Sequence, residues 1–345
     1  MSRISPFFKD VTLEGTHAVH DVDMSPASKP SIYTCEYSEK GVPNLVQNES
    51  AKRILIIAGV HGNEHNAVLA ACRLYHELSN ETYEIRRAKH DIRFLIGVNR
   101  WGLLANKREW GKRTDVYPDP MPEDGEIDFN RVWTNCPIPE INDSATHMRQ
   151  TIMTAIDAAD VVIDVHNSPA CDNMVLLNND DYVVDTIKFL NACHMPNYMV
   201  WESTTNTIKK WAIEHGKTAF TVELGGMTIG PHDGAVMIDQ VAFLKTLVSW
   251  VDDYMPVFNR GERLPPGMLA MPIYSRAYGI IDEVKMNHHV EMKKGEVFAT
   301  MMSDGGLPED LEFKAPCDGR LVCCEPARVV KPGDEVFTWQ PAIKL

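Results

Sequence analysis

The residues with the clearest chemical potential are His61 and Glu64, in the run His-Gly-Asn-Glu. This run directly follows residues 54–60, an apolar stretch that predicts a buried strand. A histidine and a carboxylate three residues apart on a tight turn can face one point, and zinc accepts both nitrogen and oxygen ligands. The same spacing arises by chance, as at His288 and Glu291, which stand among polar residues and are interpreted as plain surface. The strand end before His61 favours metal binding for the first pair.

A second histidine, His166, directly follows the apolar residues 161–165. In a doubly wound sheet the carboxyl ends of the parallel strands meet at one edge, where such sheets place their ligands. Two histidines and one glutamate leave a fourth position open for water, as a catalytic zinc site requires. We therefore expect His61, Glu64 and His166 to hold one zinc ion per chain. The plainer alternative for His166 is a hydrogen-bonded polar residue at a strand end.

Glu223 follows a third predicted strand, residues 218–222, and precedes Leu-Gly-Gly. A carboxylate that lies beside zinc-bound water without binding the metal is the expected general base and proton shuttle. Asp164 stands two residues before His166, so alternation predicts that it shares a side of the strand and can orient the histidine. Each carboxylate could instead be an ordinary hydrogen-bonded group, so both roles are hypotheses.

The run Asp128-Phe129-Asn130-Arg131 offers an amide and a guanidinium fork, which together can hold a carboxylate. From residue types alone, a surface arginine or an ion pair at a helix cap is the simpler interpretation. Upstream stands a basic cluster in an otherwise acidic chain: Lys107, Arg108, Lys112 and Arg113. A solvated loop is the simpler interpretation of this cluster, and a member that reaches the site is the functional alternative.

The elements that must position these residues alternate along the chain. Apolar β-rich runs predict strands at 54–60, 92–98, 161–165, 198–201 and 218–222, with a candidate edge strand at 31–37. Helical patterns lie between and after them, at 66–78, 145–159, 182–192, 208–215 and 236–251. Apolar strands interleaved with helices predict an α/β fold with a largely parallel mixed sheet and helices on both faces.

Beyond residue 258 the pattern changes. Residues 259–267 form a composition break typical of a linker, and short β-like runs follow it. Lys-Gly-Glu-Val-Phe at 294–298 and Pro-Gly-Asp-Glu-Val-Phe at 332–337 echo each other, and each predicts a glycine turn before a strand. We therefore predict an N-terminal extension, an α/β domain with the zinc site, and a small all-β domain that covers the cleft, at 1–50, 51–258 and 268–345.

Composition limits the partners. A formal net charge of −14 argues against nucleic acid, although a few arginines can make one pocket positive for a small anionic substrate. The longest apolar run, 54–60, is too short to span a bilayer, so no membrane role is expected. The N-terminus lacks the apolar stretch of a signal peptide, and the eight cysteines include no C-x-x-C pair. These features predict reduced thiols and a cytoplasmic protein, with a homo-oligomer left open.

The motifs His-Gly-Asn-Glu, Asp-Phe-Asn-Arg, Asp-Val-His-Asn and Val-Glu-Leu-Gly-Gly, in this order, resemble the succinylglutamate desuccinylase and aspartoacylase family. Its members are amidohydrolases related to zinc metallocarboxypeptidases. The resemblance covers residues 50 to 340, including a C-terminal β domain. It implies zinc ligands at His61, Glu64 and His166, with Glu223 as the catalytic base.

By the same resemblance, Asn130 and Arg131 would bind a substrate carboxylate. A further family arginine falls on Arg108, with a longer spacing here. A basic residue upstream of the Val-Glu-Leu-Gly motif is arginine in many relatives and Lys209 here, and lysine does not reproduce the guanidinium fork. Aspartoacylase also uses a tyrosine near its C-terminus. The last 25 residues here contain none, so specificity for N-acetylaspartate is not implied.

Together these features predict a zinc-dependent hydrolase that cleaves the amide bond of a small N-acyl amino acid or a related carboxylate-bearing substrate. The nearest alternative is a metallocarboxypeptidase that acts on short peptides. A non-catalytic zinc-dependent binding protein is an alternative from another class. Glu223 argues against it, because a binding protein needs no base beside the metal.

Overall fold

The computed structural model describes residues 18–23, 31–36, 52–79, 91–109, 128–133, 143–168, 171–180, 182–193, 195, 197–202, 206–225, 234–254, 263–284, 290–303, 311–324 and 329–343. Most of the predicted N-terminal extension, and also Lys112, Arg113 and His288, lie outside these ranges. The chain forms two units. One consists of Met1–His166, Thr205–Thr221 and His232–Met255, and the other of Asn167–Thr204, Val222–Pro231 and Pro256–Leu345.

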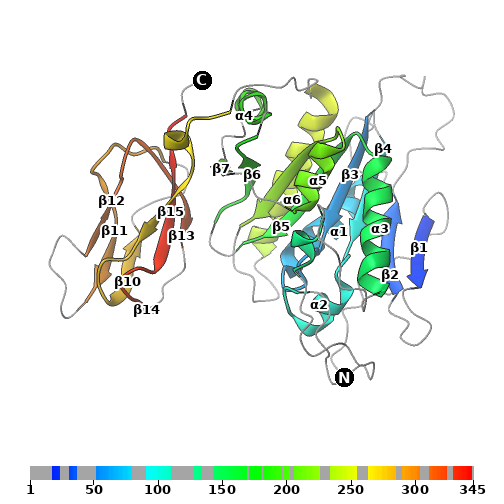
Figure 1. The fold of residues 1–345 in the computed structure, drawn as a ribbon, viewed down its shortest axis with the longest axis horizontal. Coiled ribbons are helices and arrows are strands. Elements are labelled where there is room, and N and C mark those ends of the chain that lie inside the picture. Colours follow the sequence, from blue (N-terminus) through cyan, green and yellow to red (C-terminus); the bar gives the residue numbers. More distant parts are fainter. Residues whose placement is uncertain are drawn as a thin grey trace. The chain divides into compact units, whose positions relative to one another are not determined.

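The first unit is built on a mixed sheet with the strand order β1-β2-β4-β3-β5-β8 (Figure 1). The strands are β1 (Ala18–Asp23), β2 (Ser31–Glu36), β3 (Arg53–Ala58), β4 (Asp91–Ile96), β5 (Val161–Asn167) and β8 (Thr218–Leu224). β3 runs parallel to β4 and β5, whereas β2 pairs antiparallel with β1 and β4. Every residue of β5, and every residue of β3 after Arg53, is buried, as expected for parallel strands covered on both faces.

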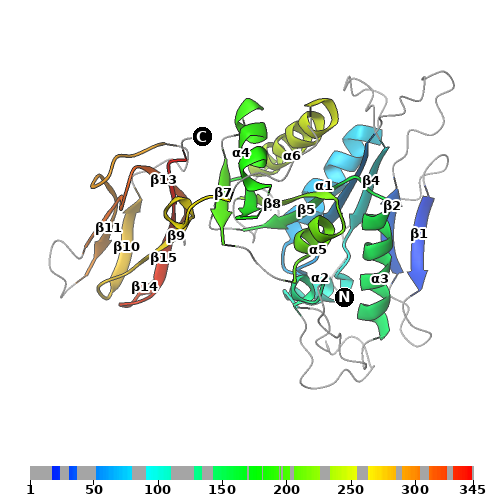
Figure 2. The ribbon, with the colours of Figure 1, turned by 45° about the horizontal axis from the view of Figure 1, so that its top comes forward.

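Helices cover both faces of this sheet (Figure 2). α1 (His65–Ser79) packs against α6 (Gly234–Tyr254) and against β3 and β4. On the opposite face, α3 (Asp143–Asp157) and α5 (Ile208–Glu214) share a buried cluster with Leu55 of β3 and Val162 of β5. The buried residues of α3 recur every three or four positions, which places them on one stripe facing the sheet: Ala145, Met148, Ile152 and Ile156.

In the second unit, α4 (Val183–Ala192) connects two parallel strands, β6 (Met174–Asn178) and β7 (Tyr198–Trp201). β7 also bonds the C-terminal region, since the Ala270 N–H donates to the Val200 carbonyl at 2.7 Å. Leu264, inside the predicted linker, is buried, and its N–H and carbonyl pair with the Asn179 side-chain amide at 2.8 and 3.0 Å. The described part of that segment is therefore anchored within the second unit.

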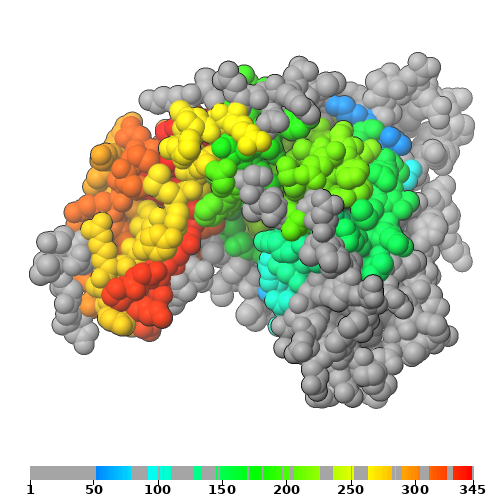
Figure 3. All heavy atoms as spheres, viewed as in Figure 1, coloured from blue at the N-terminus to red at the C-terminus, as the bar shows by residue number. Residues whose placement is uncertain are grey.

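The C-terminal region of this unit contains two antiparallel sheets, ordered β12-β11-β10-β14 and β13-β15-β9. The described atoms of this region are yellow, orange and red in Figure 3. Phe298, Phe337 and Trp339 are fully buried between the two sheets, with ring centroids 5.1 and 5.4 Å from Phe298. The strands are β9 (Met271–Tyr274), β10 (Gly279–Val284), β11 (Val297–Met302), β12 (Glu312–Lys314), β13 (Gly319–Cys324), β14 (Val329–Val330) and β15 (Glu335–Pro341).

The two echoing segments of this region fold alike. Each forms a turn that ends at a strand, β11 or β15, with its glycine in the left-handed region at φ 89° for Gly295 and 90° for Gly333. The Glu296 N–H donates to the Lys293 carbonyl at 3.1 Å, and the Asp334 N–H donates to the Lys331 carbonyl at 3.0 Å. Each of these acidic side chains also accepts a bond from the N–H of that lysine. The predicted glycine turns are confirmed.

The predicted α/β class, with a largely parallel sheet, helices on both faces and an all-β C-terminal region, is confirmed. The sequence patterns did not predict β1, β6 or the six-residue α2 (Arg100–Ala105). β3 and β4 each end two residues earlier than predicted, directly before a glycine. Among the described helices, none combines the length and the apolar character needed to cross a bilayer. The domain limits stay a prediction.

We expect Gly295→Ala and Gly333→Ala each to lower the free energy of unfolding by about 1–2 kcal/mol, because an L side chain is strained at left-handed φ. The measurement is the urea transition followed by intrinsic fluorescence. Gly267→Ala is the matched control, since this exposed glycine has no left-handed φ and no atom within 4 Å of an added Cβ. Equal midpoints for all three variants would contradict the assignment of the turns.

Candidate metal centre

His61 and Glu64 lie in the turn between β3 and α1, and their placement depends on a close backbone approach. Gly62 packs on α2 so tightly that a Cβ would come within 2.0 Å of the Gly102 carbonyl carbon. Asn99 holds the same turn: its Nδ2 donates to the carbonyls of Val60 and Arg108, each at 3.2 Å. Its Oδ1 accepts from the Gly102 N–H and caps α2. The turn after β3 is thereby tied to α2.

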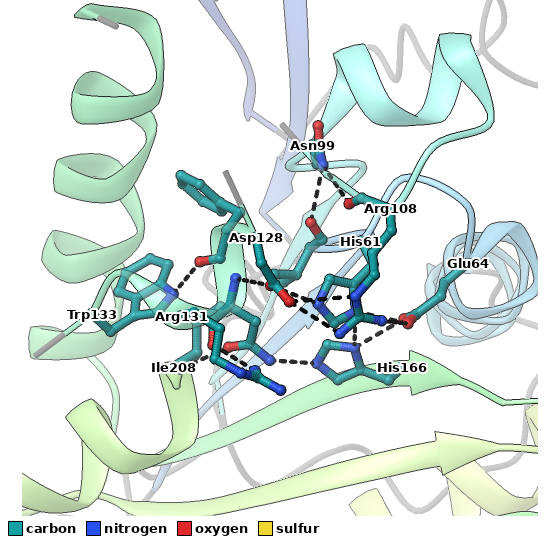
Figure 4. Close-up of polar contacts among 12 residues, drawn as sticks. His61, Glu64, Asn99, Arg108, Asp128, Arg131, Trp133, His166 and Ile208 are labelled. Atoms are coloured by element: carbon teal, nitrogen blue, oxygen red, sulfur yellow. Dashed lines mark hydrogen bonds and ion pairs between the residues drawn. The ribbon is translucent and has the colours of Figure 1, made fainter. Parts of the chain in front are cut away.

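His166 reaches the same place from β5. Ala58, the last residue of β3, pairs with Val165 of β5, which directly precedes His166, so the turn that carries His61 begins beside His166. Figure 4 shows the rings of His61 and His166 close together, with Glu64 beside both. All three side chains are buried, and one ligand atom from each lies within 4.8 Å of the others. The predicted trio is therefore brought together and could hold a metal ion.

The atoms that could bind an ion are the two Nδ1 atoms and the Glu64 carboxylate. The two Nδ1 atoms lie 3.1 Å apart, and they lie 2.7 Å (His61) and 2.9 Å (His166) from Glu64 oxygens. A tetrahedral zinc with bonds of about 2.0–2.1 Å places its ligands roughly 3.3 Å apart. The spacing fits one ion with little adjustment.

A carboxylate supports each histidine from its far side. His61 Nε2 lies 3.2 Å from Asp128 Oδ1, and His166 Nε2 lies 3.0 Å from Asp164 Oδ2. With the protons on Nε2, each ring donates to its carboxylate and turns the Nδ1 lone pair toward Glu64. Three acceptors then converge on one point, an arrangement that a cation stabilises. The donor set thus fits a bound metal ion.

The pKa shifts of Glu64 and His166 agree with strong interactions among these side chains. Burial alone raises the pKa of Glu64, but the charges and hydrogen bonds of His166 and His61 outweigh it and lower that pKa to about 2. Burial alone lowers the pKa of His166, but Asp164 and Glu64 outweigh it and raise that pKa well above its usual range. Without a metal, a proton on His166 is therefore favoured. Metal binding must displace it, so we expect metal affinity to fall as the pH falls.

Arg108 contacts the site through Asp128 and Glu64. Its Nε and Nη2 both donate to Asp128 Oδ2 at 3.3 Å, and its Nη1 lies 3.5 Å from Glu64 Oε1. Burial raises the pKa of Asp128, but the His61 bond and charge, with Arg108, outweigh it and hold that pKa well below its usual range. The Arg108 side chain is 38% exposed, so it faces both the buried ligands and solvent.

Asn130 and Arg131 lie in the short 3₁₀ turn Phe129–Arg131. Asn130 is buried: its Oδ1 accepts from the Ile208 N–H at 3.0 Å, and its Nδ2 lies 3.1 Å from His166 Nε2. Arg131 is exposed, and its Nη1 donates to the Asn130 carbonyl at 2.8 Å (Figure 4). The structure therefore brings the Asn130 amide to a metal-ligand histidine and leaves the Arg131 guanidinium at the surface.

The two remaining predicted site residues lie on β8 and α5. Glu223 is half-buried near the end of β8, and the next residue, Leu224, accepts bonds from Asn167 Nδ2 at 2.7 Å and the Ser168 N–H at 3.0 Å. Lys209 is buried in the first turn of α5, directly after Ile208. Their roles stay predictions.

Sequence patterns missed two residues that build the site. Asp128 was expected only as part of a carboxylate-binding run, yet it supports His61 and pairs with Arg108. Asn99, fully buried, carries no chemical motif. Its one signal is its position directly after an apolar strand, like that of His61 and His166.

Comparison with known proteins adds independent findings. Residues 50–247 match the family model of the succinylglutamate desuccinylase/aspartoacylase catalytic domain. No curated protein sequence matches the chain significantly.

Several solved structures share the fold. A succinylglutamate desuccinylase/aspartoacylase from Rhodobacter sphaeroides is 17% identical, with a TM-score of 0.61 over 95% of this chain and 94% of that chain. The product-bound ectoine utilization protein EutE (DoeB) from Ruegeria pomeroyi is 16% identical, with a TM-score of 0.61 over 94% and 93%. An aspartoacylase family protein from Mesorhizobium loti is 19% identical, with a TM-score of 0.59 over 95% and 94%. At these identities the likeness concerns the fold alone.

We expect Asp128→Asn to weaken metal binding by roughly 10- to 100-fold, because it removes the charge that supports His61. Isothermal titration of a divalent transition-metal ion into metal-free protein measures this. Asp160→Asn is the matched control, since Asp160 is also a paired aspartate of the first unit but bonds Arg53 instead. Equal affinities for the two variants would remove Asp128 from the metal centre.

Proposed function

Since the chain belongs to the succinylglutamate desuccinylase/aspartoacylase family, we propose that it is a zinc-dependent amidohydrolase. Its substrate is a small N-acyl amino acid or a related molecule with a free carboxylate. The observation that carries this proposal is the buried trio His61, Glu64 and His166, whose ligand atoms converge. Two nitrogen donors and one carboxylate are a set typical of catalytic zinc, which keeps a further position open.

His61, Glu64 and His166 would hold the ion, and Asp128 and Asp164 would orient the two rings toward it. When bound, zinc supplies a Lewis acid that polarises the amide carbonyl and makes a nearby water more acidic. Arg108 lies between Asp128 and Glu64, so its guanidinium can also stabilise negative charge that develops on the substrate.

Glu223 is the proposed general base. It accepts the proton of the attacking water and then delivers that proton to the leaving amine nitrogen. The support is its place in the sheet: Leu224, the next residue, is hydrogen-bonded to Asn167 and Ser168, which directly follow His166. The carboxyl ends of β5 and β8 are thus neighbours.

Arg131 is the proposed carboxylate clamp. Its guanidinium is exposed, and Nη1 donates to the Asn130 carbonyl. In this proposal its other N–H groups donate to the substrate carboxylate, and Asn130 donates an N–H of its side-chain amide to the same carboxylate. Arg108 is the better second basic contact, because it lies at the metal ligands, whereas Lys209 is buried in α5.

A hydrolysis panel tests the function. We expect N-acyl amino acids to be cleaved by the zinc-loaded protein and the activity to be lost with a chelator and restored by zinc. Blocked peptides with a free C-terminus form the comparison set. Preferential release of C-terminal residues would instead establish a metallocarboxypeptidase. Zinc binding without hydrolysis of either set would establish a binding protein.

Glu223→Gln should keep its zinc while kcat falls by roughly two or more orders of magnitude, because the amide cannot accept the proton. Elemental analysis and initial rates measure the two quantities. Glu214→Gln, at the exposed end of α5, is the matched control and should change neither. Loss of zinc from the Glu223 variant would make this residue a ligand, and full activity would remove it from the mechanism.

Arg131→Ala should raise KM strongly and lower kcat, because a bidentate clamp both binds and orients the substrate. Arg131→Lys should recover little, since a point charge does not reproduce the planar fork. The critical comparison is an active substrate against its carboxamide, measured as kcat/KM. Equal cleavage of both by the unsubstituted enzyme would refute the clamp.

A further inference from the structure

Two cysteines of the second unit, Cys171 and Cys323, face each other. Cys171, just before β6, forms an isolated antiparallel bridge with Cys323 of β13. Cys171 is buried in a small apolar cluster with Met174, Met199 and Val322, and Cys323 packs against this cluster from a half-buried position. The bridge therefore joins residues 152 positions apart in the chain.

The two thiols lie close enough to interact. A hydrogen bond between them, followed by burial and the nearby charge of Glu223, raises the pKa of Cys171 well above its ordinary value. The Cys171 Sγ also lies 3.8 Å from the Ser168 carbonyl oxygen. Both residues are free thiols in the structure. The pair is thus held together by backbone and side chain alike.

We propose that Cys171 and Cys323 are a redox-active thiol pair that a hydroperoxide converts to a disulfide. Directly opposed residues of an antiparallel ladder have Cα atoms about 4.5–5.5 Å apart. This lies inside the range of roughly 4.4–6.8 Å found for disulfides. The Cα spacing of the pair therefore permits the bond.

The reaction balances with hydrogen peroxide as the two-electron oxidant. The half-exposed Cys323 meets the peroxide first: its thiolate attacks one oxygen, the O–O bond breaks, and the released hydroxide is protonated to water. The sulfur of Cys171 then attacks the Cys323 sulfenic acid, loses its proton, and displaces the second water. Two thiols and one peroxide thus give one disulfide and two waters.

The disulfide would form beside Glu223. Gly225, two residues after Glu223, packs so closely on this segment that an added Cβ would lie 2.1 Å from the Cys171 carbonyl oxygen. The Gly225 N–H also donates to the Asn173 side chain at 3.0 Å. Oxidation would therefore tie β13 covalently to the segment against which the end of β8 packs. This inference does not depend on the proposed hydrolysis.

The experiment uses the full-length protein, reduced with a phosphine, desalted, and treated with a small molar excess of hydrogen peroxide. Trypsin then cleaves the chain under non-reducing conditions, which places Cys171 and Cys323 on different peptides. Peptide 150–188 contains Cys171 as its only cysteine, and peptide 321–328 contains Cys323 and Cys324. We expect a linked pair of these peptides, two hydrogens lighter than their sum. Thiol titration in denaturant should show that the number of free thiols falls from eight to six.

Variants identify the bond. Cys323→Ser and Cys171→Ser should each abolish the linked pair, whereas the matched Cys324→Ser, one residue further along β13, should retain it. The link should also form in Glu223→Gln, whatever the activity of that variant. Oxidation that leaves peptide 150–188 unlinked, or a link that survives Cys323→Ser, would overturn the proposal.

Discussion

The structure depends on the convergence of three electron-pair donors, the Nδ1 atoms of His61 and His166 and the Glu64 carboxylate, in a buried space. Behind them stand two more carboxylates, Asp128 and Asp164. Such a cluster is costly to bury unless positive charge accompanies it. Arg108 together with a divalent cation would balance the charge of the three carboxylates. The metal is thus expected to contribute to the stability of the turns around it as well as to chemistry.

The surrounding fold positions these side chains. Parallel pairing of β3 with β5 brings two histidines from distant parts of the sequence to one sheet edge. Asn99 secures the turn that carries His61, and the Phe129–Arg131 turn supplies a buried amide beside His166 and an exposed guanidinium next to it. In the proposed function, metal binding and substrate binding would therefore share short stretches of chain, so a change in one is expected to alter the other.

Much of the fold followed from periodicity. The buried part of β3 is apolar, β5 is apolar before His166 except at Asp164, and α3 carries an apolar stripe, so both kinds of element have strong signals. β6 and α2 are five and six residues long, and at that length an apolar run does not distinguish a strand from a turn of helix. The grouping of β6 and β7 with the C-terminal region had no sequence signal, because it rests on bonds such as that between Asn179 and Leu264.

The sequence by itself determined that His61, Glu64 and His166 converge, because each stands directly after an apolar run or one turn beyond it, and parallel strands end at one edge. It also determined the two glycine turns, since their residues act locally. Only the tertiary structure decided that Asp128 supports His61, that Arg108 bonds Asp128, and that Cys171 meets Cys323. These contacts join residues that are remote in the chain. No local propensity or period encodes such a pair, so only the packing of the whole chain can select it.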